Sequence, residues 1–334
     1  MTNDFSYYLR KYLTEYLPRE KGFNTNTIDT YRYTFILLLE YLKTIGIKAE
    51  KLTVGDITKE IIVQFLSYLE DNRNNSAVTI NSRLAALHSF FRYLQYEYPD
   101  YSDEYIKILT IPFKKIKRKQ RGYLTIEEMT LLLKEIDISN NDGQRDYMMI
   151  LLMYETAVRV SELINVRFVD FRLSKPYSLQ VLGKGNKQRY IPVSDAFILK
   201  LKEYIHHPMN QKKIETDYLF YNHSHQQLTR TGVGYILNKY VEKAKNNNPH
   251  LFKTKISPHT LRHTKAMHLL QDDVNLIYIR DILGHESIQT TEIYARTDSA
   301  RMRQAIEKSY KSLSSESESI WQNDSILDWL KQFY

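Results

Sequence analysis

Two histidines, an arginine and a tyrosine in the last third of the sequence are of the types that bind and attack a phosphate. Ser257 followed by Pro258 predicts a helix start, because serine caps a helix and proline suits its first position. His259 and Arg262 then share one face of the first turn, where free backbone N–H groups and the helix dipole favour an anion. The candidate residues are His259, Arg262, His285 and Tyr294.

A second helix is expected to position His285. Its apolar pattern runs from about Val274 to Leu283, and Gly284 is a typical helix stop. His285 follows in the turn, and Tyr294 is expected on a further short helix. These elements predict one phosphate site that all four side chains share.

The order and spacing of these residues resemble the C-terminal signature of the tyrosine recombinases, also called the phage integrase family. That signature is His-x-x-Arg-His, then Leu-Gly-His, then a tyrosine nine residues later, and residues 259–263, 283–285 and 294 supply it. Upstream, residues 156–163 resemble the family's first arginine motif, usually Thr-Gly-x-Arg-x-x-Glu-Leu, with Ala157 at the common glycine. Alanine has less backbone freedom, which bears on this turn but not on Arg159. Taken alone, Arg159 beside Glu162 indicates a structural ion pair.

A β-hairpin is predicted between the two arginine motifs. Residues 178–182 and 188–193 read as strands, and residues 183–187 supply a glycine-containing turn. The Gly-x-x-x-x-Gly-Lys-Ser/Thr pattern of a nucleotide-binding loop is not present. A plain exposed hairpin is one interpretation. The resemblance instead assigns Lys184 to the active site, with Lys187 as the second candidate.

The resemblance implies strand transfer on DNA without a cofactor. In-line attack builds charge on the non-bridging oxygens of a phosphodiester, and guanidinium groups suit these oxygens because they stay protonated and bind two at once. A phenol attacks poorly until its proton is drawn off beside cations. The product is a 3′-phosphotyrosyl link and a free 5′-hydroxyl. The implied catalytic set is Arg159 and Arg262 on the phosphate, Lys184 as general acid, His259 in proton transfer, His285 as a phosphate ligand, and Tyr294 as nucleophile.

Composition favours a polyanionic partner and argues against several other classes. The net charge is +8 and the pI is near 9.2. There is no cysteine, which excludes a disulfide scaffold and a thiolate zinc site and fits a reducing cytoplasm. His259 and His263 have the spacing of zinc ligands on a helix, but Thr260 stands where a zinc protease has Glu and no third ligand is evident. No cofactor is expected, since the sequence shows neither a nucleotide loop nor a carboxylate cluster for two Mg²⁺ ions.

The sequence shows no secretory or membrane segment. The N-terminus lacks a basic region followed by an apolar core, and the longest apolar run, Met148 to Tyr154, is too short to span a bilayer. A cytoplasmic protein is expected, associated with the bacterial nucleoid during recombination.

Helices are predicted throughout the first ~110 residues. Apolar residues recur at helical spacing over residues 3–17, 27–43, 58–70 and 78–94. The fourth helix leaves a polar face of Asn81, Ser82, Arg83, His88 and Arg92, which is typical of a solvated surface. Resemblance to the recombinase core-binding domain favours DNA contact by Arg83 and Arg92.

A basic segment separates this domain from the rest. Residues 114–122 carry too much like charge to pack into a core, so we expect a linker that binds phosphates without reading sequence. A nuclear-localisation or general polyanion patch is the alternative. The predicted DNA contacts are Lys114, Lys115, Lys117, Arg118, Lys119 and Arg121. The expected domains are residues 1–113 (core-binding), 114–122 (linker), 123–311 (catalytic) and 312–334 (tail).

The tail is expected to bury apolar surface. Residues 296–310 predict a helix, 312–319 a solvated stretch, and 326–333 a short amphipathic helix. Both tryptophans, Trp321 and Trp329, lie in this tail. Such a surface docks either on its own domain or on a neighbouring subunit. Family members exchange C-terminal segments between protomers, which favours the second.

The expected fold is mainly α with a small β-hairpin or sheet, comprising a helical core-binding domain and a mixed α/β catalytic domain. The expected function is site-specific DNA recombination by an integrase, resolvase or transposase of a mobile element, as a tetramer on paired double-stranded sites. A catalytically silent DNA-binding regulator and a type IB-like topoisomerase are the alternatives. The complete six-residue set favours recombination. With no arm-binding domain before the first helix, a simple two-domain recombinase is expected.

Overall fold

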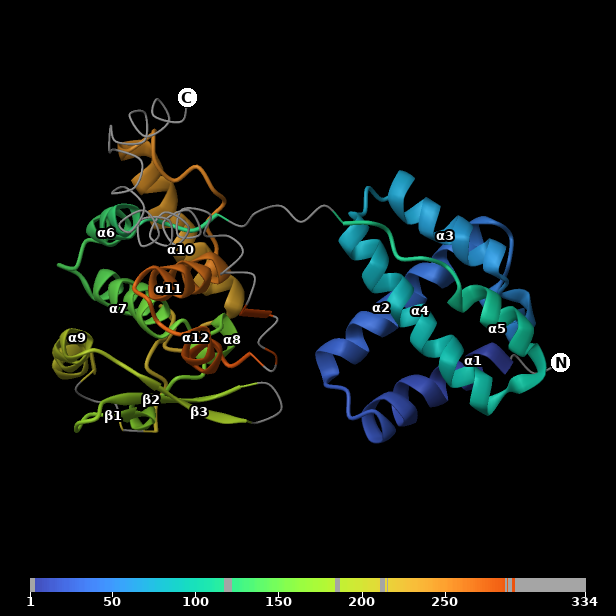
Figure 1. The fold of residues 1–334 in the computed structure, drawn as a ribbon, viewed down its shortest axis with the longest axis horizontal. Helices are drawn as coiled ribbons and strands as arrows, with labels where there is room; N and C mark the ends of the chain where they lie inside the picture. Colours follow the sequence, from blue (N-terminus) through green and yellow to red (C-terminus); the bar gives the residue numbers. More distant parts are fainter. Residues whose placement is uncertain are drawn as a thin grey trace, which may run out of the picture. The chain divides into compact units, whose positions relative to one another are not determined.

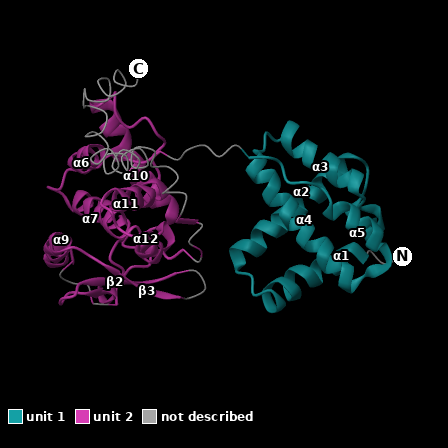
Figure 2. Cartoon of the chain, in the orientation of Figure 1, with its two compact units in different colours: residues 1–119 teal, residues 120–334 magenta. Residues whose placement is uncertain are grey.

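The computed structural model divides the chain into two compact units, unit 1 (residues 1–119) and unit 2 (residues 120–334), shown in Figure 2. It describes residues 4–116, 122–183, 187–210, 214, 216–285, 287 and 290–291. The predicted two-domain architecture is confirmed. The finer boundaries of linker and tail stay predictions.

Unit 1 is built from helices (Figure 1). They are α1 (Asp4–Lys11), η1 (Tyr12–Glu20), α2 (Thr25–Thr44), α3 (Lys59–Asp71), α4 (Ala77–Glu97) and α5 (Ser102–Leu109). Asn24, Thr58 and Ser76 cap α2, α3 and α4 by accepting a backbone N–H three residues on. The predicted helices are confirmed with one difference, because the first changes to a π-helix at Tyr12. Pro18 lies in that segment, and a proline cannot complete an ordinary helical hydrogen bond.

Aromatic contacts on α4 form the centre of the unit 1 core. The ring of Phe90 meets Tyr12 at 5.1 Å and Phe35 at 5.0 Å between centroids, both edge to face. Phe90 also meets Phe5 of α1 at 5.8 Å. These buried rings pack η1, α1 and α2 onto α4.

Unit 2 combines helices with one small antiparallel sheet (Figure 1). The helices are α6 (Ile126–Lys134), α7 (Asn141–Thr156), α8 (Val160–Leu163), α9 (Asp195–His206), α10 (Arg230–Asn247), α11 (Pro258–Gln271) and α12 (Leu276–Leu283). The strands are β1 (Phe171–Arg172), β2 (Ser178–Leu182) and β3 (Gln188–Pro192), in the order β1-β2-β3. The mainly α fold with a small sheet is confirmed, and β1 extends the predicted hairpin.

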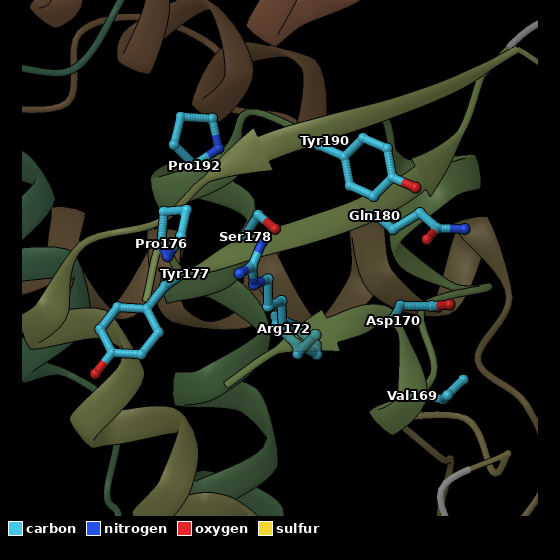
Figure 3. A pocket seen from close by; sticks show the side chains of 10 residues that line it. Val169, Asp170, Arg172, Pro176, Tyr177, Ser178, Gln180, Tyr190 and Pro192 are labelled. Atoms are coloured by element: carbon cyan, nitrogen blue, oxygen red, sulfur yellow. The ribbon is translucent and has the colours of Figure 1, made fainter. Parts of the chain in front are cut away.

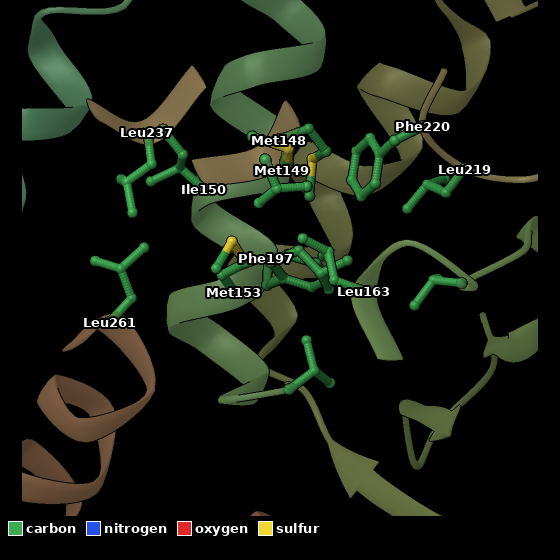
Figure 4. Close-up of a cluster of buried hydrophobic side chains, with 14 of the residues drawn as sticks. Met148, Met149, Ile150, Met153, Leu163, Phe197, Leu219, Phe220, Leu237 and Leu261 are labelled. Atoms are coloured by element: carbon green, nitrogen blue, oxygen red, sulfur yellow. The ribbon is translucent and has the colours of Figure 1, made fainter. Parts of the chain in front are cut away.

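The core of unit 2 surrounds α7 (Figure 4). Met148, Met149 and Met153 of this helix are buried, together with Phe197 of α9 and Leu261 of α11. Methionine side chains are flexible enough to fill irregular gaps between helices of different direction. Helix α7 is thereby held in the middle of the unit, and its last residue leads into the first arginine motif.

The sheet has one buried and one solvent-facing side. Leu179 pairs with Ile191 and Val181 pairs with Arg189, so these four side chains share the inward side. The other side carries the exposed Tyr190 and borders a hollow of about 530 Å³ (Figure 3). The pairing therefore places an arginine among inward-facing apolar residues.

The segment that leads into α10, residues 216–229, is not helical. Within it, Tyr218 bridges to Arg167 and Tyr221 bridges to Gln227 in short antiparallel contacts.

Candidate active site

Helix α11 begins as the sequence predicts. The Ser257 hydroxyl accepts a hydrogen bond from the backbone N–H of Thr260 (3.3 Å), and Pro258 stands at the first helical position. His259 is exposed, whereas Arg262 is buried. The first turn thus presents His259 at the surface and directs Arg262 into the unit.

Arg262 joins two distant segments of unit 2. Its Nη1 donates to the carbonyl oxygen of Ala157 at 2.7 Å, and its Nη2 donates to the carbonyl oxygen of Leu283. Ala157 directly follows α7, and Leu283 is the last residue of α12. Hydrogen bonds from a charged donor are stronger than neutral ones, so one buried guanidinium fixes two helix ends against α11.

Ala157 makes the turn out of α7 in a left-handed conformation, with φ 50° and ψ 28°. A residue with a Cβ pays about 1–2 kcal/mol for this region, which the family's usual glycine avoids. The alanine is fully buried in a small cluster with Met267, Ile279 and Leu283. Alanine therefore makes the turn that the motif requires, and its methyl group adds apolar contacts.

Arg159 lies just before α8 and is oriented by Glu162. Its backbone N–H donates to Glu162 Oε2 (2.7 Å), and its Nη1 donates to Oε1 (3.0 Å). Its Nη2 donates to the carbonyl oxygen of Gly284 at 3.0 Å. The side chain remains 36% exposed, so the guanidinium is held by the protein and still reaches solvent.

Arg189 of β3 was not predicted as a site residue, yet it belongs to the same cluster. Its Nη1 and Nη2 donate to Oε1 and Oε2 of Glu162, both at 2.8 Å, and its Nε donates to the carbonyl oxygen of Ile282 at 3.1 Å. Strand alternation is the signal that could have found it, since Arg189 lies two residues before the buried Ile191. An arginine on that side needs a buried acceptor, which Glu162 provides.

Glu162 is a nearly buried acidic residue, whose side chain is only 4% exposed. Burial alone would raise the pKa of this carboxyl. Hydrogen bonds from Arg189 and from the Arg159 N–H, with both guanidinium charges, outweigh that effect and hold the pKa below its ordinary value. The carboxylate is therefore ionised at neutral pH. Two guanidinium groups face one carboxylate, so the cluster keeps a net positive charge for an anion.

Three guanidinium groups converge on the carboxyl end of α12. Carbonyl groups at a helix end lack intrahelical donors and carry the negative end of the dipole, so cationic donors suit them. Gly284 leaves the helix with φ 61°, and the next N–H, that of His285, returns to Arg280 O at 3.1 Å. The three bonds run from Arg189 to Ile282, from Arg262 to Leu283, and from Arg159 to Gly284.

His285 follows this helix end directly. Its Nδ1 lies 3.0 Å from Oγ1 of the buried Thr291. Burial, together with the charges of Arg262 and Arg159, lowers the pKa of His285 to about 4. The imidazole is therefore neutral at pH 7, with one nitrogen that donates and one that accepts a hydrogen bond.

Four of the six predicted catalytic residues are described by the structure, and Lys184 and Tyr294 lie outside the described residues. The hairpin loop is closed at its base by a hydrogen bond from Gly183 N–H to the carbonyl oxygen of Lys187 (2.8 Å). Lys187, the second candidate, is exposed. The described residues Arg159, Arg262 and His285 meet at the end of α12, and His259 is close enough to contribute to the lowered pKa of His285.

The α4 face predicted to contact DNA is partly used inside unit 1. Nη1 of Arg83 donates to the carbonyl oxygen of Thr30 at 3.0 Å, which ties α4 to α2. The buried His88 places Nε2 3.1 Å from the carbonyl oxygen of Ile108. Arg92 is exposed. DNA contact by Arg83 and Arg92 stays a prediction.

The start of the basic segment is anchored on unit 1. The side-chain amide of Asn81 donates to the Lys114 carbonyl oxygen (2.9 Å) and accepts the Lys114 N–H (2.8 Å). The Lys114 ammonium also pairs with Glu70, while Lys115 is exposed. The other predicted DNA contacts in the segment lie outside the described residues, namely Lys117, Arg118, Lys119 and Arg121. The tail, residues 312–334, lies outside them as well.

The part of the chain that the structure describes contains neither a metal-binding cluster nor a membrane-spanning helix. No group of three or more His, Cys, Asp or Glu residues there could hold a metal ion. The two helical histidines differ in setting, since His259 is exposed and His263 is buried. Over the same residues, no helix combines the length and apolar character needed to cross a membrane.

Comparison with known proteins matches both units. The model of the phage integrase family matches residues 122–301, and that of the phage integrase N-terminal SAM-like domain matches residues 10–97. The putative integrase/recombinase y4rC of Sinorhizobium fredii is 33% identical over 301 residues, covering 90% of each chain. The tyrosine recombinase XerC of Oceanobacillus iheyensis is 30% identical over 302 residues, covering 89% of this chain and 93% of its own.

A solved structure extends the similarity to the fold. The XerH site-specific recombinase, in a post-cleavage complex with a palindromic difH substrate, superimposes with a TM-score of 0.65 at 25% identity. The match covers 89% of this chain and 80% of XerH. Two family models, relatives that match about nine-tenths of the chain, and the arginine–histidine cluster agree: the chain belongs to the phage integrase family and is a site-specific DNA recombinase.

Proposed function

We propose that this recombinase cuts each DNA strand by attack of the Tyr294 hydroxyl on a phosphodiester. The convergence of Arg159 and Arg262 at the end of α12, beside His285, carries the proposal. Cationic groups that are already in place stabilise the negative charge that develops on a phosphoryl group during its transfer. Arg159 and Arg262 are distant in the sequence, yet both belong to this positively charged cluster.

The proposed step exchanges one phosphoester for another. The bond from the Tyr294 oxygen to phosphorus forms as the bond from phosphorus to the 5′ oxygen breaks. His259 assists removal of the phenol proton, and Lys184 protonates the departing 5′ oxygen. A 3′-phosphotyrosyl link and a 5′-hydroxyl remain. A second 5′-hydroxyl can attack the link and rejoin the backbone, so no nucleotide hydrolysis is required.

His285 acts as a neutral ligand of the scissile phosphate. If the Thr291 hydroxyl donates to Nδ1, the ring proton is on Nε2, which can then donate to a phosphate oxygen. The low pKa of His285 supports this role, because it keeps the imidazole neutral at pH 7.

The proposal includes double-stranded recombination sites as the substrate and a tetramer that pairs two of them. The XerH complex with its difH substrate supports the DNA partner. Residues 313–334 reach a neighbouring subunit and hold the assembly, and both tryptophans, Trp321 and Trp329, lie there. Integration or transposition of a mobile element, or resolution of joined DNA, is the biological outcome, in the cytoplasm at the nucleoid.

A trapped adduct tests the chemistry. The probe is a nicked duplex carrying the sequence recovered from host DNA with the Tyr294→Phe variant. The unmodified protein should form an SDS-resistant adduct without added metal, and Tyr294→Phe should bind the duplex but form none. Tyr278→Phe, which changes an exposed tyrosine of α12, is the matched control and should keep the adduct. An undiminished adduct in Tyr294→Phe excludes this nucleophile.

The adduct experiment and a plasmid relaxation assay together separate the alternative functions. A catalytically silent regulator binds the duplex without forming an adduct. A topoisomerase relaxes supercoiled plasmid that lacks the recovered sequence, whereas the proposed recombinase needs that sequence.

A further inference from the structure

We propose that Arg189 is a positioning residue that holds three catalytic segments of this recombinase in their working arrangement. The inference rests on the proposed function, since it assigns Arg189 a part in the cleavage step. The segments are the first arginine motif with Glu162, the end of the hairpin strand at Gly183, and the end of α12 before His285.

Arg189 lies between two glycines that precede predicted catalytic residues. A Cβ atom on Gly284 would lie 3.0 Å from Arg189 Nη1, and one on Gly183 would lie 3.3 Å from the same atom. Both distances are shorter than ordinary van der Waals contact, so glycine is what permits the guanidinium to pack there. Gly183 is followed by Lys184, and Gly284 by His285. The arginine therefore fills the space between the backbones that lead to both.

All three guanidinium nitrogens of Arg189 make a hydrogen bond within the protein. Nη1 and Nη2 bind both carboxylate oxygens of Glu162, Nε binds the Ile282 carbonyl oxygen, and the side chain is only 13% exposed. Arg159, at 36% exposed, is the more open guanidinium of this pair. We therefore assign Arg189 to act on the reaction through its neighbours rather than by contact with the DNA.

Charge balance gives Arg189 a second effect. Glu162 is buried and ionised, and its one negative charge faces two guanidinium groups. Because Arg189 engages both carboxylate oxygens, the Arg159 charge is not fully cancelled and remains available to a phosphate. Without Arg189, Glu162 would be left to Arg159 alone, and the field on the phosphate would weaken.

A lysine cannot replace Arg189 in this arrangement. The guanidinium is a planar fork whose two Nη atoms match a carboxylate while Nε points elsewhere, whereas an ammonium is a point charge on a flexible stem. Arg189→Lys keeps the charge and loses the fork. This variant therefore separates the effect of the hydrogen-bond geometry of Arg189 from the effect of its positive charge.

The test compares Arg189→Lys, Arg189→Gln and the double variant Glu162→Gln/Arg189→Gln with the unmodified protein. We measure the single-turnover rate of adduct formation at saturating protein, using the nicked duplex recovered with Tyr294→Phe, and the Kd for that duplex. Arg189→Lys and Arg189→Gln should each slow the adduct about 10- to 100-fold, as loss of a supporting residue does, with Kd changed less than about threefold. The double variant should form the adduct faster than Arg189→Gln does, because it has no Glu162 carboxylate to neutralise the charge of Arg159.

Arg172→Gln is the matched control, since it removes an exposed arginine from the same sheet and should leave rate and Kd unchanged. If Arg189→Gln does not fold, Arg189→Lys still decides, since it keeps the positive charge beside Glu162 and is compared directly with the unmodified protein. The inference is overturned if Arg189→Lys forms the adduct at the rate of the unmodified protein. It is also overturned if all three variants lose adduct rate and duplex affinity to the same extent. No adduct from the unmodified protein instead overturns the proposed function.

Discussion

The Arg262 guanidinium donates a 2.7 Å hydrogen bond to the carbonyl oxygen of Ala157, 105 positions earlier in the chain. The direction of that carbonyl depends on the left-handed turn at Ala157, with φ 50°. The same guanidinium binds the last carbonyl of α12, at Leu283. The end of α7 and the end of α12 are thus coupled through one side chain, and the turn at Ala157 should be sensitive to substitution.

Ala157→Val should destabilise unit 2 by about 2–4 kcal/mol. A β-branched side chain is strained at positive φ, and the site has no room for two more methyl groups because Ala157 is fully buried. Ala157→Gly should change the free energy of unfolding by less than about 1 kcal/mol, since relief of strain is offset by a lost methyl group and a more flexible unfolded chain. Urea unfolding measures both.

The control for this pair is Ala196→Val on α9, where the alanine is exposed and the backbone is helical. Its effect should stay within about 1 kcal/mol. Equal destabilisation by Ala157→Val and Ala196→Val would contradict the argument from the turn.

His285 should make stability fall at acid pH. Its pKa is about 4 in the folded protein against 6.5 ordinarily, so the unfolded chain binds more protons between these values. The contribution of the neutral ring is complete above pH 6.5 and is lost as pH falls toward 4. Between pH 7 and 4.5 the unmodified protein should lose about 1–3 kcal/mol more stability than His285→Gln, after allowance for solvent screening.

Urea unfolding at pH 7, 5.5 and 4.5 measures this difference. His88 and His268, whose pKa values burial also lowers, are present in both proteins, so their contributions cancel. Parallel stability curves for His285→Gln and the unmodified protein would show that His285 does not titrate in this way.

The elements around the site could be predicted where local chemistry determines them. Ser257 and Pro258 start α11 and Gly284 ends α12, as expected from a few adjacent residues. Thr125 and Glu128 form the capping box of α6 by the same local chemistry. Helix caps depend on hydrogen bonds within one turn. They can therefore be read without knowledge of the tertiary fold.

The partners of polar side chains could not be read in this way. Arg83 and His88 lie on the polar side of a helical pattern, yet both bind carbonyl oxygens of neighbouring helices. Arg189 looks like an exposed hairpin residue until its alternation with Ile191 is considered. Such bonds join residues distant in sequence, and periodicity reports which face is apolar but not which polar groups find buried acceptors.

Deletion of residues 313–334 should impair pairing of two DNA sites more than binding of one. The apolar residues of this tail are expected to bury surface on a neighbouring subunit, whereas contacts to a single duplex come from elsewhere in the chain. Sizing experiments with one and two equivalents of the recovered duplex measure the two states. If the truncated protein assembles on two sites as well as the full chain does, the exchange of the tail is excluded.

Neutralising Lys115, Lys117 and Lys119 should flatten the salt dependence of DNA binding by up to about 3 in the slope of log K against log salt, since each phosphate contact contributes about 0.9. Lys114 is left in place because its ammonium already pairs with Glu70. Affinity should fall alike for all DNA sequences, because phosphate contacts carry no sequence information. Titration at several salt concentrations measures the slope.

The matched control neutralises Lys48, Lys51 and Lys134, three exposed lysines outside the basic segment. It removes the same net charge, so any general effect of charge on the protein is reproduced while local contacts of the segment are kept. The segment variant should therefore lose more slope than the control. An altered site preference with an unchanged slope would mean that these lysines read bases instead of phosphates.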